Sequence, residues 1–267
     1  MKIAKTAIIE PGAQIDDGVE IGHFCVIGSG VSIASGTKVM NNVTILGDTI
    51  IGKNNVIFPN ATLGTQPQDL KYEGEKVELV IGDNNIIREH CMFNPGTKGG
   101  ISQTIIGNSN LFMTFSHVAH DCVIGDNCIF ANNATLGGHV EVGNYVNFGG
   151  LSAAHQFVKI GSGAMIAAGS ILFQDAPPYV MCDGQRAAIR GLNRHRMRLL
   201  FDRECIDLIA SLYRRIFSKD DLMTNNAKRE LEALKAQESS NIHSVLKEIC
   251  EFVIASKRGI PINKGQI

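Results

Sequence analysis

The sequence predicts a mainly β chain, in which a parallel β-helix of hexapeptide repeats is followed by a small α-helical C-terminal domain. Two observations carry this prediction. An aliphatic residue recurs at every sixth position over most of the first two-thirds of the chain, and a small residue usually stands four places after it. Beyond Asn193 the apolar residues change to a helical spacing. A fixed six-residue period is the signature of a hexapeptide β-helix.

The repeat occupies three blocks of the chain, which are Ile3 to Leu63, Ile81 to Phe93 and Ile106 to Leu172. Three hexads would make one triangular coil, with the aliphatic side chains inside the prism and the small residues near its corners. Successive coils would stack like parallel strands, about 4.8 Å apart. The repeat therefore assigns residues 1–190 to the β-helix and residues 191–267 to the helical domain.

Two segments interrupt the repeat, near residues 69–80 and near residues 99–105. An insertion in a solenoid costs little core because it loops out from a corner, and such loops tend to carry function. The run Gln68-Asp69-Leu70-Lys71-Tyr72 favours a functional role for the first insert over a neutral excursion.

The repeat ends at Gln174–Tyr179, because Pro177 and Pro178 cannot continue a strand ladder. From Asn193 onward, apolar residues on one helical face predict three or four short helices that end near Gly259.

Bulk composition excludes several classes of function. The net charge is −1, so no global field points to nucleic acid. No apolar stretch reaches the roughly 18 residues of a membrane span, and no secretory h-region is present. The chain has seven cysteines without paired spacing, which fits free thiols in a reducing cytoplasm. We therefore expect a cytoplasmic protein without a membrane span.

Six histidines lie in the repeat region, and three of them are predicted to cluster. One coil added to His120 leads to position 138 and a second coil to position 156, so His139 and His155 each miss this column by one residue. The three imidazoles should therefore lie near one corner on three successive coils. His117 lies three residues before His120 on the same coil.

This histidine column has three interpretations. Isolated histidines on the surface of a β-helix are usually just solvated, but three histidines stacked on successive coils are unlikely to arise by chance. A three-histidine zinc site is chemically possible. General-base catalysis is the interpretation we favour, because histidine accepts protons near neutral pH and Asp121 could orient the His120 imidazole. The neighbouring Cys122 occupies an inward position, so we expect it to be buried and unreactive.

Several motifs together resemble those of the UDP-N-acetylglucosamine 3-O-acyltransferase family. They are Gln68–Tyr72, His117–Cys122, Asn132–His139, His155-Gln156-Phe157 and Asp175–Tyr179. The resemblance covers essentially the whole chain. It implies a left-handed coil and a cytoplasmic homotrimer with active sites in clefts between neighbouring solenoids.

The resemblance also implies an activity and its site. A 3-hydroxyacyl chain would pass from acyl carrier protein to the 3-position of UDP-N-acetylglucosamine, the first step of lipid A biosynthesis. His120 would be the general base, Asp121 its partner, and the Gly138 backbone N–H the oxyanion hole. The residues implied to line the cleft are Asp69, Lys71, His117, His139, His155, Gln156 and Asn193. No metal or cofactor is expected, since the acyl donor is carried on the phosphopantetheine of the carrier.

The start of the helical region departs from the family pattern. The run Gly191–Arg198 is one residue short, so the family arginine that contacts phosphate and carrier matches Arg198 best and Arg196 second. A basic helix start opposes the helix dipole and so calls for an anionic partner. Ala168 falls where the family sets acyl length with a small residue.

Other functions stay open at this level. The same base and oxyanion hole could acylate a 3-amino UDP-sugar to give an amide. An acetyl-CoA-dependent hexapeptide acetyltransferase and a non-catalytic structural solenoid are further alternatives, which the inserts and the histidine column disfavour.

Overall fold

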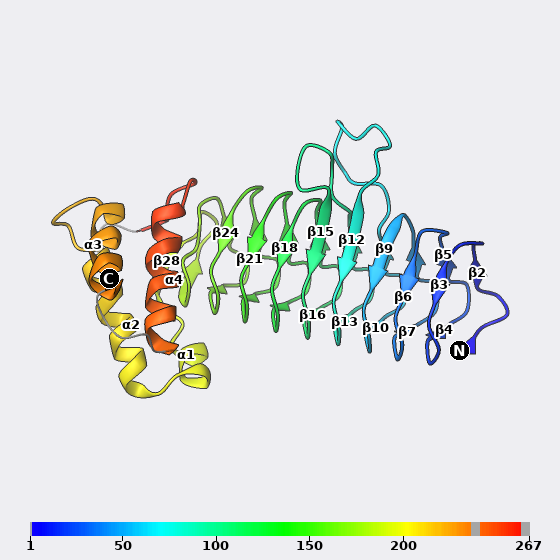
Figure 1. Ribbon diagram of the computed structural model, residues 1–267, viewed down its shortest axis with the longest axis horizontal. Coiled ribbons are helices and arrows are strands. Elements are labelled where there is room, and N and C mark those ends of the chain that lie inside the picture. The colour runs from blue at the N-terminus through cyan, green and yellow to red at the C-terminus, as the bar shows by residue number, and fades with distance from the viewer. Residues whose placement is uncertain (1, 236–240, 263–267) are drawn as a thin grey trace.

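The computed structural model describes residues 2–235 and 241–262. Its β-strands wind into a triangular prism with three parallel sheets, and four helices lie at the end of the prism farthest from the N-terminus (Figure 1). Each turn of the chain gives one strand to each sheet, and each strand pairs with those one coil before and after it. The predicted parallel β-helix with a helical C-terminal region is confirmed.

Three sheets form the sides of the prism, and their strands are short. Sheet A contains β1 (Lys2–Ile3), β4 (Glu20–Ile21), β7 (Lys38–Val39), β10 (Val56–Ile57), β13 (Ile86–Ile87), β16 (Leu111–Phe112), β19 (Ile129–Phe130), β22 (Asn147–Phe148), β25 (Met165–Ile166), β27 (Val180–Asp183) and β28 (Ala188–Leu192). Sheet B contains β2 (Ile8–Ile9), β5 (Val26–Ile27), β8 (Thr44–Ile45), β11 (Thr62–Leu63), β14 (Met92–Phe93), β17 (His117–Val118), β20 (Thr135–Leu136), β23 (Ala153–Ala154) and β26 (Ile171–Leu172). Sheet C contains β3 (Gln14–Ile15), β6 (Ser32–Ile33), β9 (Asp48–Ile51), β12 (Glu78–Ile81), β15 (Gln103–Ile106), β18 (Val123–Ile124), β21 (Glu141–Val142) and β24 (Lys159–Ile160).

The last residue of almost every strand points into the prism, as the six-residue period requires. These inward side chains form one continuous core. In its middle coils the filling is aromatic: Phe93, Phe112, Phe130 and Phe148 follow one another with ring centroids 4.7–4.8 Å apart. The spacing between coils, about 4.8 Å, therefore equals the distance at which these rings are in contact. Each of these coils thus adds one aromatic layer to the core.

The corner between sheets C and A carries a ladder of buried asparagines. The Asn55 Oδ1 accepts from the Asn85 N–H at 2.8 Å, and the Asn85 Oδ1 accepts from the Asn110 N–H at 2.9 Å. Each Nδ2 donates to a glycine carbonyl of the neighbouring coil, as from Asn110 to Gly125 at 3.0 Å. The corner therefore satisfies backbone groups that the two-residue strands leave unpaired.

Two predicted insert ends and the predicted domain boundary fall inside strands. Residues 78–80 belong to β12 and residues 103–105 to β15, because Leu79 and Thr104 are fully buried inward residues that alternate with partly exposed neighbours. The inserts are therefore the connections 64–77 and 94–102. The predicted domain boundary after residue 190 falls inside β28, which pairs antiparallel with β27.

The helices are α1 (Arg194–Leu200), α2 (Arg203–Ile216), α3 (Met223–Lys235) and α4 (Asn241–Ala255). Asp202 caps α2 by accepting from the Cys205 N–H at 2.8 Å. The fully buried Tyr213 hydroxyl donates to the Pro178 carbonyl at 2.6 Å, which ties α2 to the end of the prism. None of these four described helices has the length and apolar composition that a bilayer crossing requires.

Candidate active site

One corner of the prism, between sheets B and C, collects both inserts and the key histidines. The 64–77 insert leaves between β11 and β12, and the 94–102 insert between β14 and β15. Both loops project from the same side of the prism (Figure 1). His120 follows β17 and His139 follows β20 at this corner, on the next two coils.

His120 and Asp121 form a hydrogen-bonded pair. The His120 Nδ1 lies 2.8 Å from the Asp121 Oδ2, and the two side chains are 13% and 0% exposed. A carboxylate only accepts, so the hydrogen of this bond sits on Nδ1. The pair therefore selects the tautomer whose Nε2 is an acceptor, which is the tautomer that a general base needs.

The second insert folds over Asp121 and saturates its carboxylate. Oδ1 accepts from the backbone N–H groups of Thr97 and Ile101 at 3.1 and 2.9 Å, and Oδ2 accepts from the Thr97 hydroxyl at 2.6 Å. Burial alone would raise the pKa of Asp121, but the hydrogen bonds from Thr97 and His120 outweigh it and hold the pKa below its ordinary value. Asp121 is thus a fixed anion that orients His120.

Two glycines allow this close packing. A Cβ on Gly100 would lie 2.2 Å from the Asp121 Cγ, and one on Gly138 would lie 2.6 Å from the His120 Cε1 and 2.7 Å from its Nε2. The Gly138 backbone therefore lies directly against the imidazole. No acceptor in the described part of the chain takes the Gly138 N–H, which leaves this donor available beside the base.

His139 and His117 complete the polar surroundings of His120. The rings of His120 and His139 meet edge to face with centroids 5.0 Å apart, and His139 stacks on Phe157 at 4.3 Å. Burial lowers the pKa of His139, with only partial compensation from Asp121, and burial likewise lowers the pKa of His117. Asp69 of the first insert also acts electrostatically on His139, so this insert reaches the site.

The predicted stack of three histidines was wrong in its third member. The residue one coil beyond His139 is Phe157, which takes the stacking position. His155 instead lies beside Phe173, with ring centroids 5.7 Å apart, and its Nδ1 is 3.3 Å from the Arg258 Nη2. A shift of one residue at a tight corner changes the direction of a side chain, so a near-match in sequence does not give a contact.

A metal and a thiol are the other chemistries that the local groups could support. Ligand atoms of His120, Asp121 and His139 lie within 4.8 Å of one another. However, both Asp121 oxygens already accept two hydrogen bonds each, which a metal would have to displace. Burial raises the pKa of the Cys122 thiol to about 12, which makes it a poor nucleophile.

The remaining predicted site residues are exposed or lie at other parts of the fold. Lys71 and Gln156 are exposed at the same corner, whereas Ala168 is exposed at the corner between sheets A and B. Asn193 caps α1, accepting from the Arg196 N–H at 3.2 Å and donating to the Gly163 carbonyl at 2.9 Å.

The two candidate arginines differ in their surroundings. Arg196 donates to the Asn147 Oδ1 at 3.2 Å and lies over the Tyr145 ring, so its guanidinium is already bound to residues of the prism. Arg198 is exposed and lines a hollow of about 420 Å³ with Arg194 and Arg203. This is an anion-seeking surface at the start of the helical region.

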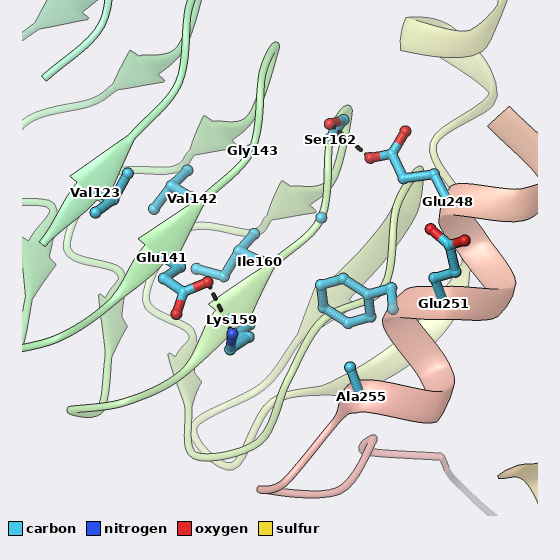
Figure 2. A pocket seen from close by; sticks show the side chains of 12 residues that line it. Val123, Glu141, Val142, Gly143, Lys159, Ile160, Ser162, Glu248, Glu251 and Ala255 are labelled. Carbon is cyan, nitrogen blue, oxygen red and sulfur yellow. Dashed lines mark hydrogen bonds and ion pairs between the residues drawn. The ribbon is translucent and has the colours of Figure 1, made fainter. Parts of the chain in front are cut away.

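Hollows flank the catalytic corner along sheet C. One of about 480 Å³ is bordered by Asp121, His139, Phe157 and Arg258. A second of about 410 Å³ lies between sheet C and α4, where Figure 2 shows the apolar floor and the Ser162–Glu248 hydrogen bond of 3.0 Å. The Lys159–Glu141 ion pair of 2.8 Å borders both hollows.

Sequence reasoning missed Thr97, Gly100 and Ile101. The Gly99-Gly100 pair inside a broken repeat was a usable signal, since glycine permits close approach of a backbone. The register of an insert does not follow from the period of the repeat, so its contacts with Asp121 could not be read from spacing.

Comparison with known proteins identifies the family. An acyl-(acyl-carrier-protein)–UDP-N-acetylglucosamine O-acyltransferase from Helicobacter pylori strain Shi470 is 58% identical over 265 residues, which is 99% of this chain and 96% of that protein. The chain belongs to the UDP-N-acetylglucosamine O-acyltransferase family. The family model described as "Udp N-acetylglucosamine O-acyltransferase; Domain 2" matches residues 175–261, and that of the bacterial transferase hexapeptide matches residues 2–39 and 103–138.

Solved structures of this family share the whole fold. A crystal structure of a UDP-N-acetylglucosamine acyltransferase is 56% identical with a TM-score of 0.95, covering 98% of this chain and 99% of that one. The enzyme from Campylobacter jejuni is 41% identical with a TM-score of 0.91, covering 98% of this chain and all of that one. The chain is therefore an acyltransferase of this family.

Proposed function

We propose that this enzyme transfers a 3-hydroxyacyl chain from acyl carrier protein to the 3-hydroxyl of UDP-N-acetylglucosamine, in lipid A biosynthesis. The observation that carries the proposal is the His120–Asp121 pair, with the Gly138 backbone against the imidazole. The names of the relatives, at up to 61% identity over nearly the whole chain, support the same substrates.

The reaction follows from the tautomer of His120. Its Nε2 takes the proton of the sugar hydroxyl as the oxygen attacks the thioester carbonyl. The carbonyl oxygen becomes an oxyanion that accepts a hydrogen bond from the Gly138 N–H. Collapse of the tetrahedral intermediate breaks the carbon–sulfur bond, and the imidazolium returns its proton to the departing thiolate. Asp121 stabilises the transient imidazolium and is not itself protonated.

No covalent intermediate or added cofactor is required by this scheme. A thioester is already activated, so one general base and one oxyanion donor suffice. The acyl group arrives on the phosphopantetheine of the carrier protein. The cluster of Arg194, Arg198 and Arg203 supports docking of an acidic carrier, because it offers three guanidinium groups around one hollow.

A homotrimer would complete the site. Leu70 at the tip of the first insert is wholly exposed, and exposed apolar residues occupy left-handed corner positions at the corner between sheets A and B, namely Phe24, Phe115 and Leu151. Ala168 lies at that same corner, away from His120 of its own chain. If Ala168 limits acyl length, it must do so in a cleft shared between two chains, which supports the trimer.

The reducing cytoplasm is the proposed compartment. All seven cysteines are free thiols, and six of them are buried. Thiols that pack as small apolar groups need no oxidising environment.

An acyl-transfer assay tests the proposal. 3-Hydroxyacyl carrier protein would be offered with UDP-N-acetylglucosamine and, in parallel, with its 3-amino analogue. We expect an ester product with the hydroxyl acceptor and loss of turnover in His120→Ala. Transfer to the amino sugar alone would replace the acceptor, and transfer to neither would overturn the proposal. Sedimentation at micromolar concentration would test the trimer, which a monomer would contradict.

A further inference from the structure

The segment that follows α4 returns to the catalytic corner and is fixed there. Asp175 is its anchor: the Ser256 hydroxyl donates to its Oδ2 at 2.7 Å, and its N–H donates to the Gly259 carbonyl at 2.9 Å. The Ile189 N–H donates to the Pro261 carbonyl at 2.8 Å. These bonds hold Arg258 at a set position near His155, which is 103 residues earlier in the sequence.

The Arg258 side chain joins two elements of the site. Its Nε donates to the Phe173 carbonyl at 3.0 Å, which fixes the plane of the guanidinium, and its Nη2 lies 3.3 Å from the His155 Nδ1. The same residue borders the hollow that contains Asp121 and His139. Arg258 is therefore both part of the site wall and a direct partner of His155.

His155 Nδ1 has two neighbours with opposite requirements. The Gln156 carbonyl, 3.2 Å away, can only accept, so it requires a proton on Nδ1. The guanidinium can only donate, so it requires Nδ1 to be bare. One ring nitrogen cannot satisfy both partners at once. A charge-assisted bond from a fixed guanidinium is stronger than a bond to a neutral carbonyl.

We propose that Arg258 is a positioning residue that holds His155 in the tautomer with its proton on Nε2. His155 then presents a hydrogen-bond donor, and it recognises an oxygen acceptor of the substrate. Without Arg258, Nδ1 would carry the proton and donate it in a hydrogen bond to the Gln156 carbonyl, and Nε2 would become an acceptor that repels the same oxygen. The recognition step rests on the proposed function, whereas the tautomer does not.

The tautomer can be measured directly. The protein would be labelled with ¹⁵N-histidine and studied at pH 8, with the His155 signals assigned by their loss in His155→Ala. We expect the Nε2–H form in the wild type and the Nδ1–H form in Arg258→Met, which has no side-chain donor. The Nδ1–H form in the wild type, or an unchanged tautomer in the variant, would overturn the proposal. This readout needs no activity, so it stands apart from failure of the acyl-transfer assay.

Steady-state kinetics test the consequence for substrate binding. Arg258→Met, which removes every donor of this side chain, should raise the KM for the acceptor sugar about 10-fold with little change in kcat, as expected for loss of a binding contact. Lys228→Met is the control: it removes a positive charge from an exposed position on α3, away from the catalytic corner, and should leave KM unchanged. Arg258→Lys, which keeps a donor, should restore part of the affinity.

A double variant separates positioning from a structural role. In the His155→Ala background, Arg258→Met should have no further effect on KM, because the imidazole it acts through is absent. Full additivity of the two effects would overturn the positioning role, and so would an equal rise of KM in Lys228→Met.

Discussion

Removal of the Thr97 hydroxyl is the sharpest test of how the second insert supports the catalytic pair. Thr97→Val keeps the shape of the side chain and the backbone N–H that binds Asp121 Oδ1. It deletes only the 2.6 Å hydrogen bond to Oδ2. The carboxylate is 0% exposed, so water cannot easily replace the lost donor.

The expected magnitude follows from these contacts. A hydrogen bond to a charged group contributes about 1.5–3 kcal/mol, so Thr97→Val should lower the free energy of unfolding by about 2 kcal/mol. Three donors to Asp121 remain, so the His120 geometry should survive and kcat/KM should fall less than about 10-fold.

The structure provides a matched control in Thr104. Its hydroxyl is fully buried and has no hydrogen-bond partner, so Thr104→Val removes the same atom without breaking a bond and should be neutral or stabilising. Urea unfolding of both variants at one protein concentration would measure the difference. Equal stabilities for the two variants would refute the reasoning.

The pH dependence of this difference has a definite sign. The pKa of Asp121 lies below its ordinary value in the folded protein, so its ionisation stabilises the fold above about pH 4. Thr97→Val should raise that pKa. The wild type and the variant then differ in unfolding free energy by a part that depends on ionised Asp121. This part should be fully present at pH 7 and should disappear as the pH falls through the pKa of Asp121 in the folded protein.

Three further substitutions probe the base, the oxyanion corner and the core. His120→Gln should lower kcat by about 100- to 10,000-fold with little change in stability, and a fully active variant would exclude the general base. Gly138→Ala should abolish turnover by displacing the imidazole, whereas Gly99→Ala, with nothing within 4 Å of the added Cβ, should not; equal rates would contradict the packing argument. Phe130→Ala should cost about 3–5 kcal/mol of unfolding free energy, against less than about 1 kcal/mol for the exposed Leu222→Ala, and similar costs would mean that the aromatic layers add no special stability.

The fold was predictable because one physical demand repeats at each coil. A prism interior accepts an apolar side chain at the same step of every hexad, so Ile27, Ile45 and Leu63 are all fully buried. Long-range pairing then follows by adding one coil. The same rule correctly predicted that His120 and His139 lie at one corner on successive coils.

The errors arose where that demand is weaker. Leu79 and Ile81 are both buried and alternate with the partly exposed Glu78 and Val80, yet the loss of the six-residue period hid this strand inside the predicted insert. His155 misses the column by one residue, and at a corner one residue separates an imidazole near Phe173 from one near His139. Arg258 was beyond reach, because its contact crosses from the helical region back to the prism.

The position of the catalytic pair explains why the repeat must break beside it. A regular coil can supply side chains to a corner, but its own backbone N–H groups are used by the ladder between coils. The Asp121 carboxylate needs several donors at once to remain ionised while buried. Within the 94–102 insert the Thr97 and Ile101 N–H groups take no part in this ladder and donate to the carboxylate instead. Breaking the repeat is therefore what allows a charged orienter to be buried next to the base.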